Sequence, residues 1–245
     1  MEKLLNDLYM AVIYQNRWQV YLEGLGNTLL ITACALLIGI LIGLVVALVR
    51  ITCAPRNNFL QKLGSWLCGL YTTVIRGTPV IVQLLILYTV ILASSEGIVV
   101  CIVGFGINSG AYLAEVARSG IASVDPGQME AGRSLGLGYG VTMRRIVLPQ
   151  AVKNILPALF NEFIALLKET SVAGYIAVRD LTKASDGIRG ITFNSVPLYL
   201  AAIIYLVFVI GITQIQKQVE RPANKSQVEI SGFGSSEKGN TKSSR

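Results

Sequence analysis

Residues 25–49 form an apolar run without a charged side chain, and this run constrains the fold more than any other feature. It exceeds the roughly 20 residues that a helix needs to cross a bilayer, and it ends at Arg50. Gly39 and Gly43 within it form a Gly-xxx-Gly pair, which indicates either close helix packing or ordinary membrane-helix glycines. Charged residues make up only 14% of the chain, against about 25% in soluble domains. The sequence therefore predicts a polytopic membrane protein.

Further apolar segments follow this first span. Residues 59–75 have helical periodicity with one polar side, and they form either an interfacial helix or the cytoplasmic part of a long, kinked span. Gly77 and Pro79 weaken the helix after it. The other apolar runs are residues 80–93, 97–117, 150–176 and 197–215. Together these runs predict about five transmembrane helices, with six as the alternative.

Basic residues predict the sidedness of the chain. Arg50, Arg56 and Lys62 follow the first span, whereas the charges before it are sparse and slightly acidic. The positive-inside rule then places the N-terminus outside, and five spans place the C-terminus in the cytoplasm. Residues 1–221 form the predicted transmembrane domain, and the Ser/Gly/Lys-rich segment 222–245 is predicted to be a disordered cytoplasmic tail. Because the basic residues are scattered, the net charge of +7 does not indicate nucleic-acid binding.

The stretch 123–151 lies between two apolar runs but is polar, basic and rich in glycine. Asp125 is a good N-cap, and Pro126 fits the first position of a helix. Gln128 stands three residues after Asp125, the spacing of a capping box. These residues predict a helix from Pro126 to about Leu135.

The glycines that follow predict how this helix ends. Gly136 and Gly138 can adopt the left-handed conformation that terminates a helix. A second short helix is expected over residues 139–146, and Pro149 suits the first turn of the next apolar helix. The stretch is thus predicted to form a helical hairpin between two membrane segments.

This hairpin resembles the cytoplasmic EAA loop of permease subunits from bacterial ABC importers. The matching positions are Glu130, Ala131, Gly136, Ile146, Leu148 and Pro149. One departure is Gly132, where the family usually has a second alanine. In that family the loop contains a coupling helix that docks into a groove of the ATPase, so the resemblance implies ATPase coupling for these seven residues. The alternative is a surface hairpin without a partner.

Other segments are similar to the polar amino acid uptake permeases within this group. They are Arg76-Gly77-Thr78-Pro79 with Gln83, Ser109–Gly120, Asn161-Glu162-Phe163 and Lys168–Ser171. The subfamily often has an acidic residue three positions before the arginine, where this chain has Thr73. The resemblance covers about residues 24–217, and it implies an all-α helical bundle of the ABC importer permease type.

Polar side chains within the fourth apolar run are the main candidates for a substrate path. Ionisable groups at membrane depth usually face a bundle interior or a wet cavity. Glu162 is expected to meet an ammonium or cationic group and Lys168 a carboxylate, while Asn161 can donate and accept hydrogen bonds. Thr78 and Glu115 are weaker candidates, since Glu115 can pair with an arginine three positions on. The competing hypothesis is that these groups pair with one another and hold the helices together.

The sequence lacks the residues that several classes of function require. The chain has no histidine, the usual general base and transition-metal ligand, and no phosphate-binding Gly-x-x-x-x-Gly-Lys-Ser/Thr sequence. Its cysteines, Cys34, Cys53, Cys68 and Cys101, have neither paired nor metal-ligand spacing. No catalytic residue, metal or cofactor is therefore predicted, and ATP hydrolysis is assigned to a separate subunit. A secondary transporter driven by an ion gradient remains the alternative, although the internal repeats typical of that class are not evident.

The resemblance implies a complete set of partners. We expect two ABC ATPase subunits, a second permease subunit that is identical or paralogous, and an extracytoplasmic binding protein that delivers the amino acid. The complex would work by alternating access in the bacterial inner membrane, with hairpin 123–151 transmitting the motion of the ATPases.

Overall fold

The computed structural model describes residues 2–52 and 58–238, and the regular structure within these ranges is helical. The α-helices are α1 (Glu2–Leu8), α2 (Trp18–Thr52), α3 (Phe59–Gly77), α4 (Val80–Ile86), α5 (Gly97–Ala122), α6 (Pro126–Ser134), α7 (Tyr139–Thr142), α8 (Leu148–Glu169), α9 (Leu181–Thr192) and α10 (Val196–Lys238). Short 3-10 or π-helical turns are η1 (Tyr9–Ile13), η2 (Tyr14–Asn16), η3 (Leu87–Ile91), η4 (Met143–Val147) and η5 (Thr170–Ile176). The prediction of an all-α fold is confirmed.

Three helical segments are long and apolar enough to cross a membrane: Trp18–Ile51, Gly97–Ala122 and Val196–Glu220. α3 and Val80–Ile91 meet the same criteria as a pair, with a bend of 105° between them. α3 packs against α2 and α5, which favours the kinked-span alternative over an interfacial helix. α8 has 22 residues but carries charged side chains, and it packs against α2, α5 and α10. Length and composition thus support three or four of the five predicted spans, and α8 as the fifth remains a prediction.

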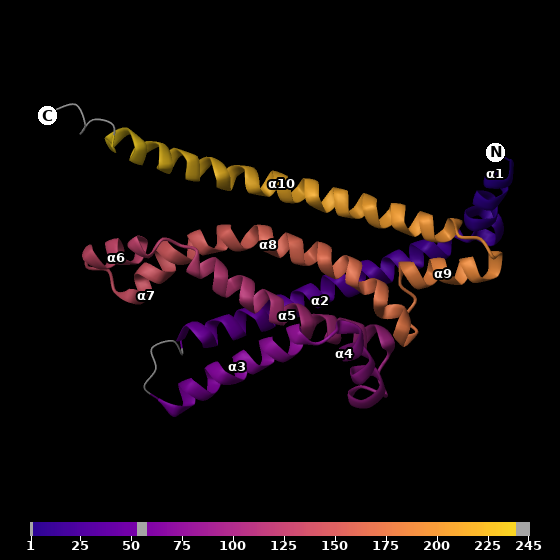
Figure 1. Cartoon of the computed structure of the whole chain (residues 1–245), viewed down its shortest axis with the longest axis horizontal. Coiled ribbons are helices and arrows are strands. Elements are labelled where there is room, and N and C mark those ends of the chain that lie inside the picture. The colour runs from indigo at the N-terminus through magenta and orange to yellow at the C-terminus, as the bar shows by residue number, and fades with distance from the viewer. Residues whose placement is uncertain (1, 53–57, 239–245) are drawn as a thin grey trace.

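The two ends of the bundle differ in what they carry (Figure 1). α6, α7 and the C-terminal ends of α2 and α10 lie at one end, and α9 lies with the N-terminus at the other. Arg50 lies in the last turn of α2, and Arg144 and Arg145 lie in η4, directly after α7, so all three belong to this end, as the predicted sidedness requires. Arg56 falls outside the described residues. The orientation of these ends relative to the membrane remains a prediction.

The most extensive helix contact in the described part of the chain joins α2 and α5, and glycines make it close. A Cβ at Gly39 would lie 2.8 Å from Ser109 Oγ, and one at Gly43 would lie 2.8 Å from Leu113 Cβ. On α5, Gly106 and Gly110 make matching approaches to isoleucines of α2. The close-packing interpretation of the Gly-xxx-Gly pair is therefore correct.

The largest apolar core joins α2, α4, α5, α8 and the turn η5. Its most completely buried members are Ile31, Leu84, Val100, Phe105 and Leu166. This core fixes α4, the short second half of the bent pair, against the rest of the bundle.

α9 is a short amphipathic helix that connects α8 and α10 without spanning, as predicted for the polar run after Arg179. Asp180 is fully buried and caps it, accepting hydrogen bonds from Thr182 N at 2.8 Å and Lys183 N at 3.1 Å. Burial raises the pKa of the Asp180 carboxyl above its usual range, and these N–H donors oppose the rise. Thr28 of α2 accepts from Leu181 N at 3.1 Å, so α9 is fixed to the N-terminal part of α2.

α10 extends past Pro222, where composition predicts a disordered tail, and continues to Lys238. The disorder of that tail remains a prediction. Extending an existing helix adds one hydrogen bond per residue and needs no new nucleus, so composition alone predicts such an end poorly. Residues 239–245 lie outside the described part of the chain.

Candidate functional site

The hairpin begins with the predicted N-cap but not with the predicted capping box. The Asp125 carboxylate accepts a hydrogen bond from Gly127 N at 2.8 Å, and Pro126 stands in the first turn of α6. The side chain of Gln128 instead accepts from Gln150 Nε2 at 3.3 Å, across the hairpin. The capping-box prediction is wrong because a partner distant in sequence engages the glutamine.

α6 ends in a Schellman motif, in which two backbone bonds close the last turn. Leu137 N donates to Gly132 O at 3.1 Å and Gly136 N to Arg133 O at 3.0 Å. Gly136 has φ +81°, as predicted. Gly138 differs from its prediction: it is extended, with φ −65°, because it is the N-cap of α7 rather than part of the preceding turn. α7 then continues through η4 directly into α8, and Pro149 lies in the first turn of α8 as expected.

Gly132 is where α6 and α7 touch. It is buried, and a Cβ added there would lie 2.4 Å from Thr142 Cγ2 and 3.1 Å from Ile146 Cδ1. Thr142 is itself fully buried and donates to Gly138 O at 3.2 Å. The departure from the family's usual alanine is thus accommodated by a β-branched residue on the facing helix.

The outer surface of the hairpin is exposed and partly apolar. Glu130 and Ala131 lie on the exposed side of α6, and Leu148 and Pro149 are exposed at the start of α8. The side chains that add apolar surface nearby are Leu135 (80% exposed), Tyr139 (53%) and Val141 (43%). Exposed apolar patches of this kind mark interaction sites on soluble surfaces.

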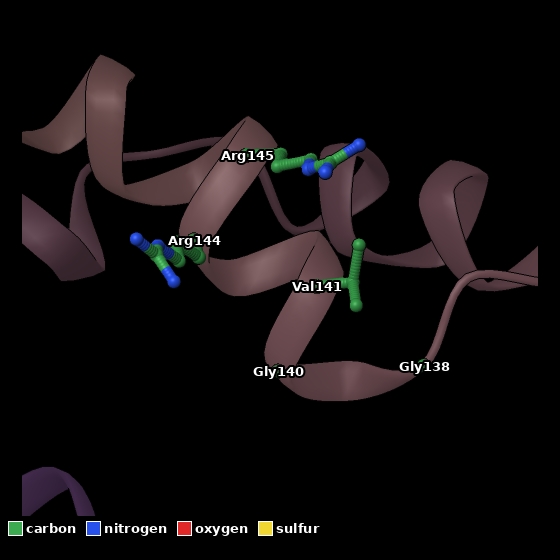
Figure 2. A pocket seen from close by; sticks show the side chains of 5 residues that line it. All are labelled: Gly138, Gly140, Val141, Arg144 and Arg145. Carbon is green, nitrogen blue, oxygen red and sulfur yellow. The ribbon is translucent and has the colours of Figure 1, made fainter.

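A shallow hollow of about 600 Å³ lies on α7 and η4. It is lined by Gly138, Gly140, Val141, Arg144 and Arg145. In Figure 2, Arg144 and Arg145 project to different sides from the same turn, above the glycine backbone of α7. The hairpin therefore presents an open, basic and apolar surface, together with most of the residues that the EAA resemblance assigned to coupling.

The break between α3 and α4 is closed by one glutamine. Gln83 Nε2 donates to Ile75 O at 2.8 Å, Thr78 O at 3.1 Å and Thr78 Oγ1 at 2.8 Å. Asn108 Nδ2 of α5 donates to Gln83 Oε1 at 3.1 Å. Gln83 thus satisfies the Ile75 carbonyl, which Pro79 leaves without its helical donor, as well as the Thr78 carbonyl at the bend, and α5 holds it in place. The Thr78 hydroxyl also donates to Val74 O at 2.9 Å, so much of its hydrogen-bonding capacity is used within the break.

The polar residues of α8 do not share one surface. Glu162 lies close to the Ser109 hydroxyl of α5, although that buried oxygen has no hydrogen bond of good geometry. Glu169 is near enough for the two carboxylates to repel each other. Lys168 instead lines a groove of about 570 Å³ beside Tyr205 of α10. Asn161 is exposed in the single chain.

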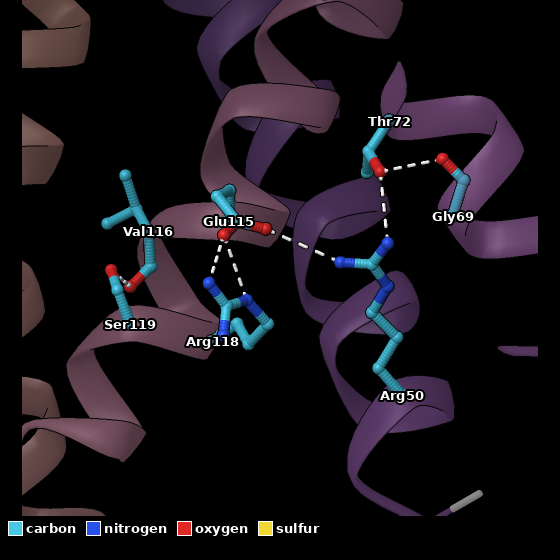
Figure 3. A network of polar contacts seen from close by, with 7 residues as sticks. All are labelled: Arg50, Gly69, Thr72, Glu115, Val116, Arg118 and Ser119. Carbon is cyan, nitrogen blue, oxygen red and sulfur yellow. Dashed lines mark hydrogen bonds and ion pairs between the residues drawn. The ribbon is translucent and has the colours of Figure 1, made fainter. Parts of the chain in front are cut away.

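Glu115 belongs to an ion-pair cluster that joins three helices (Figure 3). Its carboxylate accepts from Arg118 Nε at 2.9 Å and from Arg50 Nη1 of α2 at 3.4 Å. Arg50 Nη2 also donates to Thr72 Oγ1 of α3 at 3.1 Å. Glu115 is therefore held by ion pairs within the bundle. This favours the hypothesis that Glu115 holds the helices together over the hypothesis that it binds the substrate.

The sequence interpretation missed the partners in both clusters. Arg50 was used only as a mark of sidedness, and neither Asn108 nor its bond to Gln83 was anticipated. The only available signal was that each is a polar residue inside or at the edge of an apolar run. No group of three or more potential metal ligands occurs in the described residues. Cys34 and Cys101 are free there, and Cys53 lies outside the described ranges.

Comparisons with known proteins agree with this geometry. The family described as "Binding-protein-dependent transport system inner membrane component" matches residues 39–225. The arginine transport system permease protein ArtQ of Bacillus subtilis (strain 168) is 38% identical over 205 residues, covering 82% of this chain and 90% of the relative. The putative glutamine transport system permease protein GlnP of Rickettsia typhi is 34% identical over 205 residues, covering 82% of this chain and 91% of the relative.

Solved structures show the same fold. A crystal structure of an amino acid ABC transporter with histidines superposes with a TM-score of 0.76 at 38% identity, covering 83% of this chain and 94% of that chain. The inward-facing MetNI methionine ABC transporter superposes with a TM-score of 0.74 at 18% identity, covering 85% of this chain and 98% of that chain. At this identity the likeness concerns the fold alone. The resemblance to amino acid permeases is confirmed, and the chain belongs to the family of binding-protein-dependent transport system inner membrane components, as a multi-pass permease of the ABC transporter type.

Proposed function

We propose that this chain is the permease subunit of an ATP-driven importer for a polar or charged amino acid. The observation that carries the proposal is the hairpin, whose exposed apolar and basic surface lies at one end of the bundle. Family membership assigns such a permease to a binding-protein-dependent system. The named relatives transport arginine or glutamine, so these two amino acids are the first probes to use.

The hairpin docks into a separate ABC ATPase subunit at the cytoplasmic face. The N-terminus and α9 then lie outside, where an extracytoplasmic binding protein delivers the amino acid. A second permease subunit, identical or paralogous, completes the path. ATP-driven closure of the ATPases moves the hairpin, and α5 and α8, which flank it in the chain, convert that movement into alternating access.

Glu162 and Asn161 of α8 line the path for the substrate. The carboxylate of Glu162 meets the ammonium or a cationic side chain, because an unpaired charge in a low-dielectric bundle is costly. The Ser109 hydroxyl and the repelling Glu169 lie near it, and Glu162 makes no ion pair in the described part of the chain. A cationic group of the substrate supplies the missing partner.

Reconstitution tests the transport class. The permease is expected to co-purify with an ATPase and to take up labelled L-arginine or L-glutamine into proteoliposomes only when ATP and the binding protein are present. Uptake that persists without the ATPase and stops when ionophores remove the ion gradients would instead identify a secondary transporter.

Glu162→Gln tests the path residue, since it keeps the shape and removes the charge. Uptake is expected to fall or change its amino acid preference, while assembly and basal ATPase activity persist. Glu23→Gln is the matched control, because Glu23 is exposed near the start of α2, and its ion pair among the described residues is with Arg179 at 3.5 Å. Unchanged uptake and preference would remove Glu162 from the path, and loss of assembly would support the structural alternative.

A further inference from the structure

Arg76 is a cation inside the bent span with no anionic partner of its own. Its guanidinium lies over the ring of Tyr112, 5.1 Å from the centroid. It makes no hydrogen bond or ion pair with any residue in the part of the chain that the structure describes, and its side chain is exposed in the single chain. An arginine within a membrane helix that lacks a partner indicates a functional site.

Neighbours on the same helix do not supply that partner. The positions three and four residues before it on α3 are Thr73 and Thr72, neither of them acidic, and α3 ends at Gly77, one residue after it. The field of Glu115 reaches Arg76, but this carboxylate already binds Arg50 and Arg118. Three arginines therefore surround one carboxylate, and the group carries excess positive charge.

The depth of Arg76 excludes an ordinary surface role. Tyr112, against which it stacks, stands ten residues before the end of α5, which is about 15 Å along a helix about 39 Å long. This position is near the middle of a segment long and apolar enough to cross the membrane. A guanidinium at such a depth does not face hydrocarbon, so its exposed side must face a wet cavity or a second subunit.

Side-chain contacts hold the break that follows Arg76 and the guanidinium itself. Gln83 and Asn108 fix the break directly after it, and Tyr112 restrains the guanidinium itself. A restrained guanidinium presents two parallel N–H donors that match a carboxylate, and little side-chain entropy remains to be lost on binding. The site is therefore suited to a carboxylate rather than to a large hydrated cation or a neutral solute.

We propose that Arg76, restrained by Tyr112, binds the α-carboxylate of the transported amino acid inside the path. This inference rests on the proposed function. It assigns to Arg76 the binding of the substrate carboxylate, a role for which the sequence predicted Lys168. Lys168 lies instead in the groove beside α10, away from the Ser109 side of α8 where Glu162 lies. Arg76 for the carboxylate and Glu162 for the cationic group would give a zwitterion a partner for each charge.

The test uses the full complex of permease, ATPase and binding protein in proteoliposomes, with labelled L-arginine and L-glutamine as probes. Arg76→Gln removes the charge, Arg76→Lys keeps it without the two-pronged geometry, and Arg179→Gln is the matched control at an exposed position. The measured quantities are uptake, ATPase rate and ATP hydrolysed per amino acid. Each variant is measured in phosphatidylcholine vesicles with and without phosphatidylglycerol.

Arg76→Gln is expected to raise the ATP hydrolysed per amino acid by about tenfold or more, the loss typical of one charged hydrogen bond, while the ATPase rate is retained. Arg76→Lys should show a smaller rise, and Arg179→Gln none. If Arg76→Gln does not assemble, Arg76→Lys is the test: a rise in the ATP hydrolysed per amino acid supports the inference, and no rise refutes it.

Three results would overturn the inference. The first is an unchanged amount of ATP hydrolysed per amino acid. The second is a defect confined to vesicles with phosphatidylglycerol, which would assign Arg76 to a lipid phosphate. The third is failure of both variants to assemble, which would give Arg76 a structural role. A wild-type complex that takes up no amino acid would instead overturn the proposed function.

Discussion

Replacing Gly132 by the family's usual alanine should weaken the hairpin, although alanine is the better helix former. The new methyl would lie 2.4 Å from Thr142 Cγ2, whereas packed carbons sit about 3.5–4.0 Å apart. The nearby Ile146 Cδ1, at 3.1 Å, is the end of a flexible side chain and can move aside. Thr142 cannot do so easily, because it is fully buried and its hydroxyl is bonded to Gly138 O.

The expected magnitude follows from two opposing effects. Overpacking of this kind costs about 1–3 kcal/mol, and alanine gains about 1 kcal/mol over glycine within a helix. Gly132→Ala should therefore lower the free energy of opening the hairpin by about 0–2 kcal/mol. Thr142→Ser removes the clashing methyl and keeps the hydroxyl, so the double variant should recover that loss. The coupling between the two sites should be about 1–3 kcal/mol in a double-mutant cycle.

Hydrogen exchange of residues 126–147 in the assembled complex measures this opening directly. Gly190→Ala of α9 is the control, because nothing lies within 4 Å of a Cβ added there and α9 lies at the other end of the bundle from the hairpin. The control should leave exchange unchanged, and Gly132→Ala should accelerate it. Additive effects of Gly132→Ala and Thr142→Ser, with no recovery in the double variant, would refute the steric reasoning.

Three further predictions concern the turn, the sidedness and the break. Gly136→Val should abolish uptake while insertion persists, because a β-branched residue tolerates φ +81° poorly; normal uptake with normal ATPase stimulation would count against docking. Asn6→Cys in a cysteine-free background should react with an impermeant thiol reagent at the outer face, and protection would favour six spans. Gln83→Leu should lower the melting temperature of the complex, because it leaves the carbonyl oxygens of Ile75 and Thr78 without this donor, each costing about 1–3 kcal/mol if buried. An unchanged melting temperature would show that water replaces the glutamine.

Local features of the hairpin could be predicted because their causes are local. The Asp125 cap and the positive φ of Gly136 depend on residues within one turn of the chain. The capping box failed on the same stretch, since Gln128 is engaged by Gln150, 22 positions away. Spacing identifies which bonds a side chain can make, but not which distant competitor it meets.

The candidate path shows the same limit more strongly. Helical spacing separates Glu162 from Lys168, yet only the packing of α8 between α5 and α10 places one beside Ser109 and the other in a separate groove. The spacing of three residues predicts that Glu115 pairs with Arg118, but the second partner of Glu115, Arg50, is 65 positions away. The Glu115–Arg50 pair forms between helices, so a single sequence reveals the charge of Glu115 and not this partner.

Under the proposed coupling, these contacts give a movement at the hairpin a route to the break, about 25 Å away at about 1.5 Å per residue along α5. One face of α5 carries Asn108 on the break, Tyr112 under Arg76, and Glu115 on Arg50. The same helix leads through Ser123 into the cap of α6. Because α5 is continuous between these contacts, a rotation imposed by the hairpin must either carry α2, α3 and α4 with it or break the Glu115 cluster. The glycine contacts with α2 favour the first outcome, since such close surfaces resist sliding. The proposed Arg76 site would then change its exposure as part of a rigid unit.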